Sequence, residues 1–225
     1  MIETIGRAIA GALILAGLPV HLAICALIWL GDRGSPLYRA RRIGKGGVPF
    51  VMLKYRTMRM NCAAQVNRDF KTVVQSNDSR VTIFGRFLRA SGVDELPQLL
   101  NILRGDMSWV GPRPDESWMG PNYGATIRRR VSVKPGITGL AQIFDGRFLS
   151  TARCYAIDLW YIRHRSFWLD LYVVATTPVF LAGFRTIARP RLQSLVSSRE
   201  FSDLELICSR EIEAASRNLR PVSAS

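Results

Sequence analysis

Two adjacent carboxylates, Asp94 and Glu95, are the residues of this chain whose type and surroundings best suit chemistry. They stand within RFLRASGVDELPQLLNILRGDMSWVGPRP, the stretch 86–114, among arginines, glycines and prolines. An aspartate carboxylate can attack phosphorus, and a divalent cation between a carboxylate and a pyrophosphate would neutralise charge on the phosphoryl oxygens. Taken alone, such a pair more often caps a helix and complements its dipole. The surrounding residues must therefore show whether the pair is catalytic or only caps a helix.

A helix should position the pair, because leucines recur at the spacing of one helical face: Leu96, Leu99, Leu100 and Leu103. The pattern predicts a helix that begins with Asp94 at or near its N-cap and ends at about Arg104, before Gly105. Pro97 is tolerated in a first turn. The positive end of the helix dipole would keep Asp94 ionised at neutral pH. Successive helical residues point about 100° apart, so the two carboxylates should differ in role, one attacking and the other binding a metal.

Two rigid turns follow the pair. The first is the segment 111–114, Gly-Pro-Arg-Pro, in which two prolines stiffen the backbone around Arg113 and suit its guanidinium to a phosphate. The second is the segment 134–139, Lys-Pro-Gly-Ile-Thr-Gly, directly after the basic run 128–130. Neither is a Walker loop. Each alone is more often a plain turn, but together they suggest loops around a site.

Composition sets the class of partner. The chain has 225 residues, enough for one catalytic domain with a core, and is 48% hydrophobic with a net charge of +14. This charge favours a polyanionic partner such as anionic lipid, nucleic acid or a nucleotide-linked substrate. Nucleic-acid-binding patterns are absent, so no nucleic-acid partner is predicted. The four cysteines are widely spaced and predict neither a disulfide framework nor a metal site.

The N-terminal part predicts a membrane segment. No formally charged residue lies between Ala8 and Leu30, and the run is too long for a signal peptide. Pro19 lies near its middle and would bend a helix, so a re-entrant hairpin and a transmembrane helix are equally consistent with the run. The segment 33–59 then carries eight basic residues and no acidic one, which suits anionic headgroups on the cytoplasmic face.

Two further segments complete the chain. The apolar run 167–184 contains Asp170 and Pro178, which favours an amphipathic helix lying in the membrane interface over a spanning one. After Arg185 the tail is rich in Arg, Ser and Glu, and the segment 201–217 has the pattern of a short amphipathic helix without an assigned function.

The motifs resemble those of the bacterial sugar transferase family, the monotopic polyprenyl-phosphate phosphoglycosyl transferases. The resemblance rests on LRASGVDELPQLLNILRGDMSWVGPRP, preceded by FVMLKYRTM and followed by VKPGITGLAQIFDGR and the segment Asp158–Tyr161, and covers about Pro36 to Leu181. It implies a mostly helical α+β fold, with a small membrane-associated catalytic domain, a re-entrant N-terminal helix and interfacial amphipathic helices. The expected domains are residues 1–33 for the membrane helix, 34–185 for the catalytic domain and 186–225 for a tail.

The resemblance also implies roles for residues. Asp94 matches the nucleophile that attacks the β-phosphate of a nucleotide diphosphate sugar, typically UDP-linked, to form a phosphosugar-aspartate intermediate, and Glu95 matches its partner in the dyad. Magnesium is implied near Asp94, and a polyprenyl phosphate then accepts the phosphosugar. The candidate substrate and phosphate contacts are Lys54, Arg56, Arg89, Arg113, Gln142, Arg147 and Asp158.

The N-terminus departs from the family pattern. Family members break their membrane helix at Ser-Pro or a similar pair, where this chain has Leu18 and Pro19. The usual entry of basic and aromatic-aspartate pairs is replaced by Ile2, Glu3, Ile5 and Gly6 with a lone Arg7. The resemblance implies an enzyme of the bacterial inner membrane, its catalytic domain on the cytoplasmic face, that starts a surface polysaccharide or glycoconjugate; a homo-oligomer is compatible with it. The alternative is a non-catalytic basic membrane adaptor that retains the fold.

Overall fold

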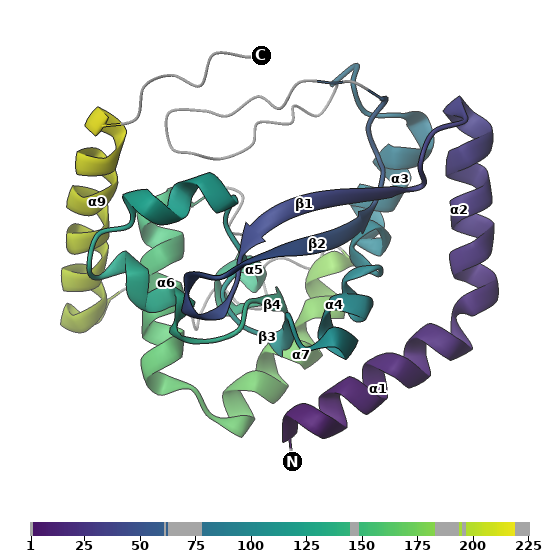
Figure 1. Ribbon diagram of the computed structural model, residues 1–225. Coiled ribbons are helices and arrows are strands. Elements are labelled where there is room, and N and C mark those ends of the chain that lie inside the picture. The colour runs from purple at the N-terminus through teal and green to yellow at the C-terminus, as the bar shows by residue number, and fades with distance from the viewer. Residues whose placement is uncertain are drawn as a thin grey trace.

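A computed structural model describes residues 2–60, 62, 78–144, 149–182, 194 and 197–218. These residues are mostly helical and include two-stranded sheets, which confirms the expected α+β, mostly helical class. Helices α1 and α2 lie along one side of the molecule and α9 on the other (Figure 1).

The N-terminal apolar run forms two helices rather than one. Helix α1 covers Ile2–Ala16 and α2 covers Leu18–Asp32, with Gly17 between them. Pro19 lies in the first turn of α2, where it cannot donate to a carbonyl of the preceding turn, so the hydrogen bonding of α1 does not continue. The two helices are bent by 64°. No single described helix is long and apolar enough to cross a bilayer, and α1 with α2 meets that length and composition only as a bent pair.

A β-hairpin carries most of the basic segment that follows. Strands β1 (Leu37–Ile43) and β2 (Pro49–Tyr55) pair antiparallel, with Leu37 opposite Tyr55 (Figure 1). The turn includes the 3-10 segment η1 (Lys45–Gly47), in which Gly46 adopts φ 70°. Side chains alternate between faces along the strands, so basic residues on the outer face leave Ala40 and Met52 in the core.

The segment with the two carboxylates is not the single helix that the leucine spacing predicted. Helix α3 covers Ile83–Ser91, the 3-10 turn η2 covers Val93–Glu95, and α4 covers only Gln98–Arg104. Pro97 has no N–H group to donate back to the turn before it, which separates η2 from α4. Asp94 therefore lies in η2 and does not cap α4, so the predicted helix start was wrong. The predicted end is confirmed, because Gly105 adopts φ 90° directly after Arg104.

The buried face of α4 also differs from the leucine stripe, since Leu103 is 37% exposed. The buried residues of this helix are Gln98, Leu99, Asn101 and Ile102. Asn101 accepts a hydrogen bond from Leu53 N (3.0 Å) and donates one to Val51 O (2.7 Å). The buried Asn101 of this short helix thus provides hydrogen-bond partners for the backbone groups of β2 that do not pair with β1.

A parallel strand pair joins the two glycine-proline turns. Strand β3 (Ser108–Val110) pairs with β4 (Gly136–Thr138). The backbones approach so closely that a Cβ on Gly136 would lie 2.2 Å from Gly111 N. Glycine at both positions allows the pairing.

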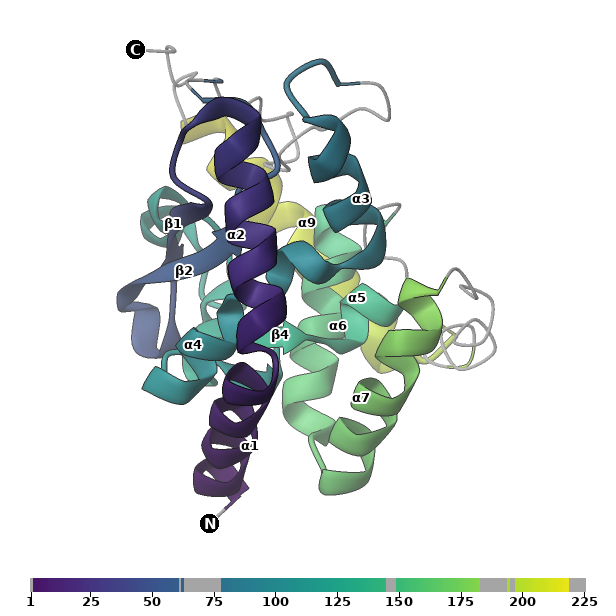
Figure 2. The ribbon, with the colours of Figure 1, turned by 90° about the vertical axis from the view of Figure 1, so that its right-hand side faces the viewer.

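The remaining elements enclose the main core. They are the 3-10 segments η3 (Ser117–Asn122) and η4 (Ile127–Ser132), and the helices α5 (Leu140–Ile143), α6 (Thr151–His164), α7 (Phe167–Leu181) and α9 (Arg199–Asn218). Helix α9 packs against α6, and both lie on the far side of the molecule from α2 (Figures 1 and 2). Its side chains Phe201, Leu204 and Cys208 belong to the same buried cluster as Tyr161 and Val173. The helix expected in the tail is confirmed, but it shares its core with the segment 34–185 that was expected to form a separate domain.

Helix α7 is apolar on more than one side. Leu169 and Val173 are buried, whereas Phe167 and Trp168 are 61% and 75% exposed. The proline expected to disfavour a spanning helix, Pro178, lies inside its last turn. The interfacial position expected for this helix stays a prediction.

Candidate active site

Glu95 is held by two cations. Lys54 Nζ donates to Glu95 Oε1 at 2.6 Å, and Arg113 Nη2 donates to the same oxygen at 2.9 Å. Lys54 comes from β2 and Arg113 from the Gly-Pro-Arg-Pro turn, so three distant segments meet at this carboxylate. Burial alone would raise the pKa of Glu95, but the charges of Arg113 and Lys54 outweigh it and hold the pKa well below its usual range. These contacts therefore favour the ionised form of Glu95 and hold its carboxylate between two cations.

Asp94 stands in a different environment. Among the described residues, its carboxylate has no hydrogen bond or ion pair. Burial raises the pKa of Asp94 above its ordinary value, with a contribution from the charge of Glu95, while Lys54 and Arg113 act in the opposite direction. The helix-dipole argument predicted the opposite influence, since it placed Asp94 at a cap. The two carboxylates thus differ as expected, for a reason that depends on tertiary contacts.

Arg89 adds a third basic residue near the pair. It lies in the last turn of α3, and its Nε donates to Thr57 Oγ1 at 2.7 Å. Burial lowers the pKa of Arg89, and the attraction of Asp94 opposes that shift. The structure therefore brings Lys54, Arg89 and Arg113 together around Asp94 and Glu95, as the sequence motifs suggested.

The turn of Arg113 is fixed through its backbone. Arg130 Nη2 donates to Arg113 O at 3.1 Å, and Gly136 N donates to Pro112 O at 3.1 Å. The Arg113 side chain itself is 49% exposed. A rigid backbone thus presents a half-exposed guanidinium beside Glu95, which is the arrangement expected of a phosphate-binding arginine.

Two other predicted contact residues lie in ion pairs of their own. Arg56 donates through Nη1 and Nη2 to both Asp32 oxygens (2.6 and 2.5 Å) and through Nε to Ser35 O (2.6 Å). It connects the end of α2 to the hairpin. Asp158 is buried in α6, where Oδ2 accepts from Arg130 Nε (3.0 Å) and Nη2 (2.8 Å), and burial raises its pKa to about 6. The substrate contacts of both residues stay predictions.

The last two candidates are less informative. Gln142 lies in α5, where Nε2 donates to Ile137 O at 3.4 Å and the buried Oε1 has no hydrogen-bond partner among the described residues. Arg147 lies outside the described residues.

Sequence reasoning missed three features that position the site. Asn101 and Arg130 act on backbone groups far along the chain, and their only local signals are an Asn within an apolar helix face and one Arg in a run of three. The third is the docking of α1, which uses the residues that depart from the family pattern. Lys134 Nζ donates to Glu3 Oε2 (2.8 Å), Trp109 Nε1 to Gly6 O (2.9 Å) and Arg7 Nε to Leu103 O (2.8 Å).

The side chains near Asp94 suit a magnesium ion that is bound by one carboxylate and completed by substrate and water. Among the described residues, no group of three or more His, Cys, Asp or Glu side chains is arranged to hold an ion. Magnesium in phosphate-transfer sites commonly uses one or two carboxylates and completes its shell with water and substrate oxygens. Asp94, with oxygens free of other partners, suits a site that the substrate completes.

The fold and the site define a small, mostly helical α+β protein whose carboxylate pair lies among cations beside a bent apolar helix pair. The family model described as bacterial sugar transferase matches residues 2–183, and the chain belongs to this family.

Curated relatives share most of the chain. A UDP-glucose:undecaprenyl-phosphate glucose-1-phosphate transferase from Xanthomonas campestris pv. campestris is 41% identical over 179 residues, which cover 75% of this chain and 36% of that protein. A protein of the same name from Caulobacter vibrioides is 43% identical over 75% of this chain and 65% of its own length. The exopolysaccharide production protein ExoY of Rhizobium meliloti is 40% identical over 71% of this chain and 75% of its own length. The chain thus spans about a third of the Xanthomonas relative.

Proposed function

We propose that this protein transfers a sugar-1-phosphate from a nucleotide diphosphate sugar, UDP-linked as in the names of its relatives, to a membrane polyprenyl phosphate. The product would start a surface polysaccharide or glycoconjugate, in line with the name of the ExoY relative. The observation that carries the proposal is the asymmetry of the carboxylate pair. Glu95 is neutralised by two cations, whereas the half-buried Asp94 carboxylate next to it has no such partner among the described residues and is free to react.

In the first step, an Asp94 carboxylate oxygen attacks the β-phosphorus of the nucleotide sugar. A bond forms between that oxygen and phosphorus, the bond from the β-phosphorus to the bridging oxygen breaks, and the nucleoside monophosphate leaves with the electron pair. In the second step, a polyprenyl phosphate oxygen attacks the same phosphorus. The Asp94 ester bond breaks and the carboxylate is restored, with a lipid diphosphate sugar as the product.

The cations around Asp94 suit both steps. Lys54 and Arg113 are fixed by Glu95 before substrate arrives, so their charge is already in place where negative charge develops on the phosphoryl oxygens. Arg113 is half-exposed and retains donors for a phosphate, while its backbone is held by Arg130. Glu95 acts by holding these two cations, since its lowered pKa makes it a poor proton acceptor.

Magnesium would be held at Asp94 and would neutralise pyrophosphate charge. The protein residues orient the phosphate and supply the fixed positive charge.

The proposed location is the cytoplasmic face of a bacterial inner membrane, with α1 and α2 as a re-entrant hairpin. Both ends of this pair contact the same catalytic region. Near the start of α1, Glu3 and Arg7 bond to Lys134 and Leu103 O, and at the end of α2 Asp32 bonds to Arg56. A straight spanning helix would put its two ends on opposite sides of the bilayer, so these contacts favour the hairpin.

The test uses the full chain in lipid nanodiscs with magnesium, undecaprenyl phosphate and a panel of nucleotide sugars, with release of nucleoside monophosphate as the readout. We expect release with at least one sugar and its loss in Asp94→Asn, in which the amide is not a nucleophile. The adaptor hypothesis predicts no release with any sugar. Full activity in Asp94→Asn would remove the nucleophile assignment.

A further inference from the structure

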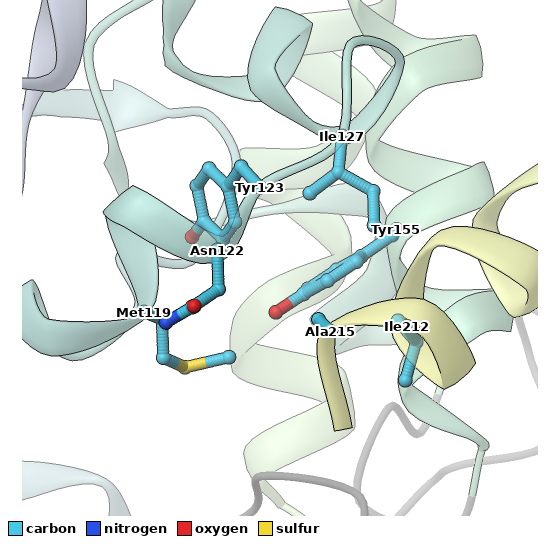
Figure 3. A pocket seen from close by; sticks show the side chains of 7 residues that line it. All are labelled: Met119, Asn122, Tyr123, Ile127, Tyr155, Ile212 and Ala215. Carbon is cyan, nitrogen blue, oxygen red and sulfur yellow. The ribbon is translucent and has the colours of Figure 1, made fainter. Parts of the chain in front are cut away.

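Helix α9 lies beyond residues 2–183, the part that the family model matches, yet it contacts the catalytic region closely. It packs along α6 (Figure 1), and its side chains Phe201, Leu204 and Cys208 are buried in the main core. On the same helix, Ile212 and Ala215 face Tyr155 and Ile127 across a small apolar pocket (Figure 3). The C-terminal helix therefore reaches both α6 and the segment η4.

Glu211 provides the polar part of this contact. Its Oε1 accepts from Thr126 N and its Oε2 from Ile127 N, both at 2.9 Å. These amides open η4, where backbone N–H groups lack partners within the segment. Gly124 leaves the space for the carboxylate, since a Cβ there would lie 2.3 Å from Glu211 Cδ.

The segment that Glu211 holds carries Arg130. This buried arginine donates to Arg113 O (3.1 Å) and to Asp158 Oδ2 (2.8 Å), and it also bonds to Asp115, two residues after Arg113. Its guanidinium carbon lies 3.9 Å from the ring centre of Tyr155. Arg130 therefore holds the turn that presents Arg113 to Glu95 at two points, the backbone oxygen of Arg113 and the side-chain carboxylate of Asp115 directly after the turn.

We propose that Glu211 is a positioning residue for the proposed transferase reaction, acting through η4 and Arg130 on the placement of Arg113. The inference rests on the proposed function, and it assigns α9 a part in setting the active site. Glu211 bonds to the backbone amides at the start of η4 and not to the carboxylate pair, so it would act through other residues.

The test compares two ways of breaking one contact. Glu211→Ala removes the carboxylate, and Gly124→Ala displaces it by steric overlap with the flexible end of the Glu211 side chain. Both should lower kcat/KM for nucleoside monophosphate release by about 10- to 100-fold, because small displacements of a phosphate-binding group have effects of this size. Glu205→Ala is the matched control, since Glu205 also lies on α9 but accepts its hydrogen bond from Arg153 Nε of α6 (2.9 Å). It should leave kcat/KM within twofold of wild type.

A double-mutant cycle separates positioning from general loss of stability. If Glu211 acts through Arg113, Glu211→Ala should add less than a twofold loss in an Arg113→Ala background. A full additive loss in that background, or equal effects of Glu211→Ala and Glu205→Ala, would overturn the proposal.

Amide hydrogen exchange tests the same link without catalysis, so it distinguishes failure of this inference from failure of the proposed function. We expect Glu211→Ala and Gly124→Ala to speed exchange in the segment 126–132 and in the segment 108–115, and Glu205→Ala to change neither. If only 126–132 responds, the link from η4 to Arg113 does not exist. An inactive wild type with both segments responding would refute the transferase proposal and retain the coupling.

Discussion

Asp94 and Glu95 share a 3-10 turn and a similar degree of burial, yet their pKa values shift in opposite directions. The difference comes from one oxygen atom. Glu95 Oε1 takes the hydrogen bonds of both Lys54 and Arg113, which leaves Asp94 with their charge at longer range and the repulsion of Glu95. A direct contact outweighs burial, whereas a more distant charge does not.

The raised pKa of Asp94 predicts the acid limb of the pH profile. Only the ionised carboxylate is a nucleophile, so kcat/KM should fall with decreasing pH around an apparent pKa above the ordinary aspartate value of about 3.9. Lys54→Met removes a cation that lowers this pKa and should move the limb to higher pH. Single-turnover rates across pH measure both. A limb at or below the ordinary value, or one that stays in place in Lys54→Met, would contradict the assignment.

At the scale of elements, the docking of α4 on β2 depends on Asn101, which is fully buried. Asn101→Leu leaves Leu53 N–H and Val51 C=O without their partner and should destabilise the protein by about 3 kcal/mol. Arg104→Ala, on the exposed side of the same helix, should have little effect. Urea unfolding in detergent measures the difference. Equal stabilities for the two variants would show that Leu53 N–H and Val51 C=O find other hydrogen-bond partners.

The glycine pair between β3 and β4 gives a second prediction for an element. A Cβ on Gly136 would lie 2.2 Å from Gly111 N and 2.4 Å from Thr138 O, both backbone atoms that cannot rotate away. Gly136→Ala should therefore separate the strands and lower the thermal midpoint by several degrees. Gly31→Ala is the control, because nothing lies within 4 Å of the added Cβ. A Gly136→Ala midpoint like that of the control would show that the strand pair is dispensable.

At this scale, features that depend on neighbouring residues could be predicted from the sequence, whereas features that depend on contacts between distant segments could not. The end of α4 was predictable because Gly105 is a local signal, and its start was not, because Pro97 divides a regular leucine pattern into a 3-10 turn and a helix. Lys54, Arg89 and Arg113 were candidates because they match basic positions of the family motifs, as do Arg56 and Arg147, and the structure brings the first three near the carboxylate pair. Asn101 and Arg130 were not, since each bonds to backbone atoms of another element and no spacing of residue types encodes such contacts.

At the scale of the whole molecule, the contacts at both ends of the α1–α2 pair predict its topology. In a cysteine-free background, Thr4→Cys and Arg33→Cys mark the two ends, both exposed in the structure. A re-entrant hairpin requires that both react with an impermeant maleimide in inverted membrane vesicles and that neither reacts in intact spheroplasts. Labelling of Thr4→Cys from outside would refute the hairpin, and a periplasmic control cysteine in another protein verifies the reagent.

The ion pair between Arg56 and Asp32 has a further consequence for the geometry of the membrane surface. Arg56 stands two positions after Lys54, and its N–H still pairs with Pro36 O, so both side chains project from the same face of the hairpin. Arg56 forms an ion pair with Asp32, the last residue of α2, and Lys54 forms one with Glu95. A two-residue strand step of about 7 Å therefore separates the residue that binds the end of the apolar helices from the residue that binds the carboxylate pair. One inserted residue between them would turn one of these side chains to the opposite face of the strand, so the same hairpin could no longer bind both the apolar helices and Glu95.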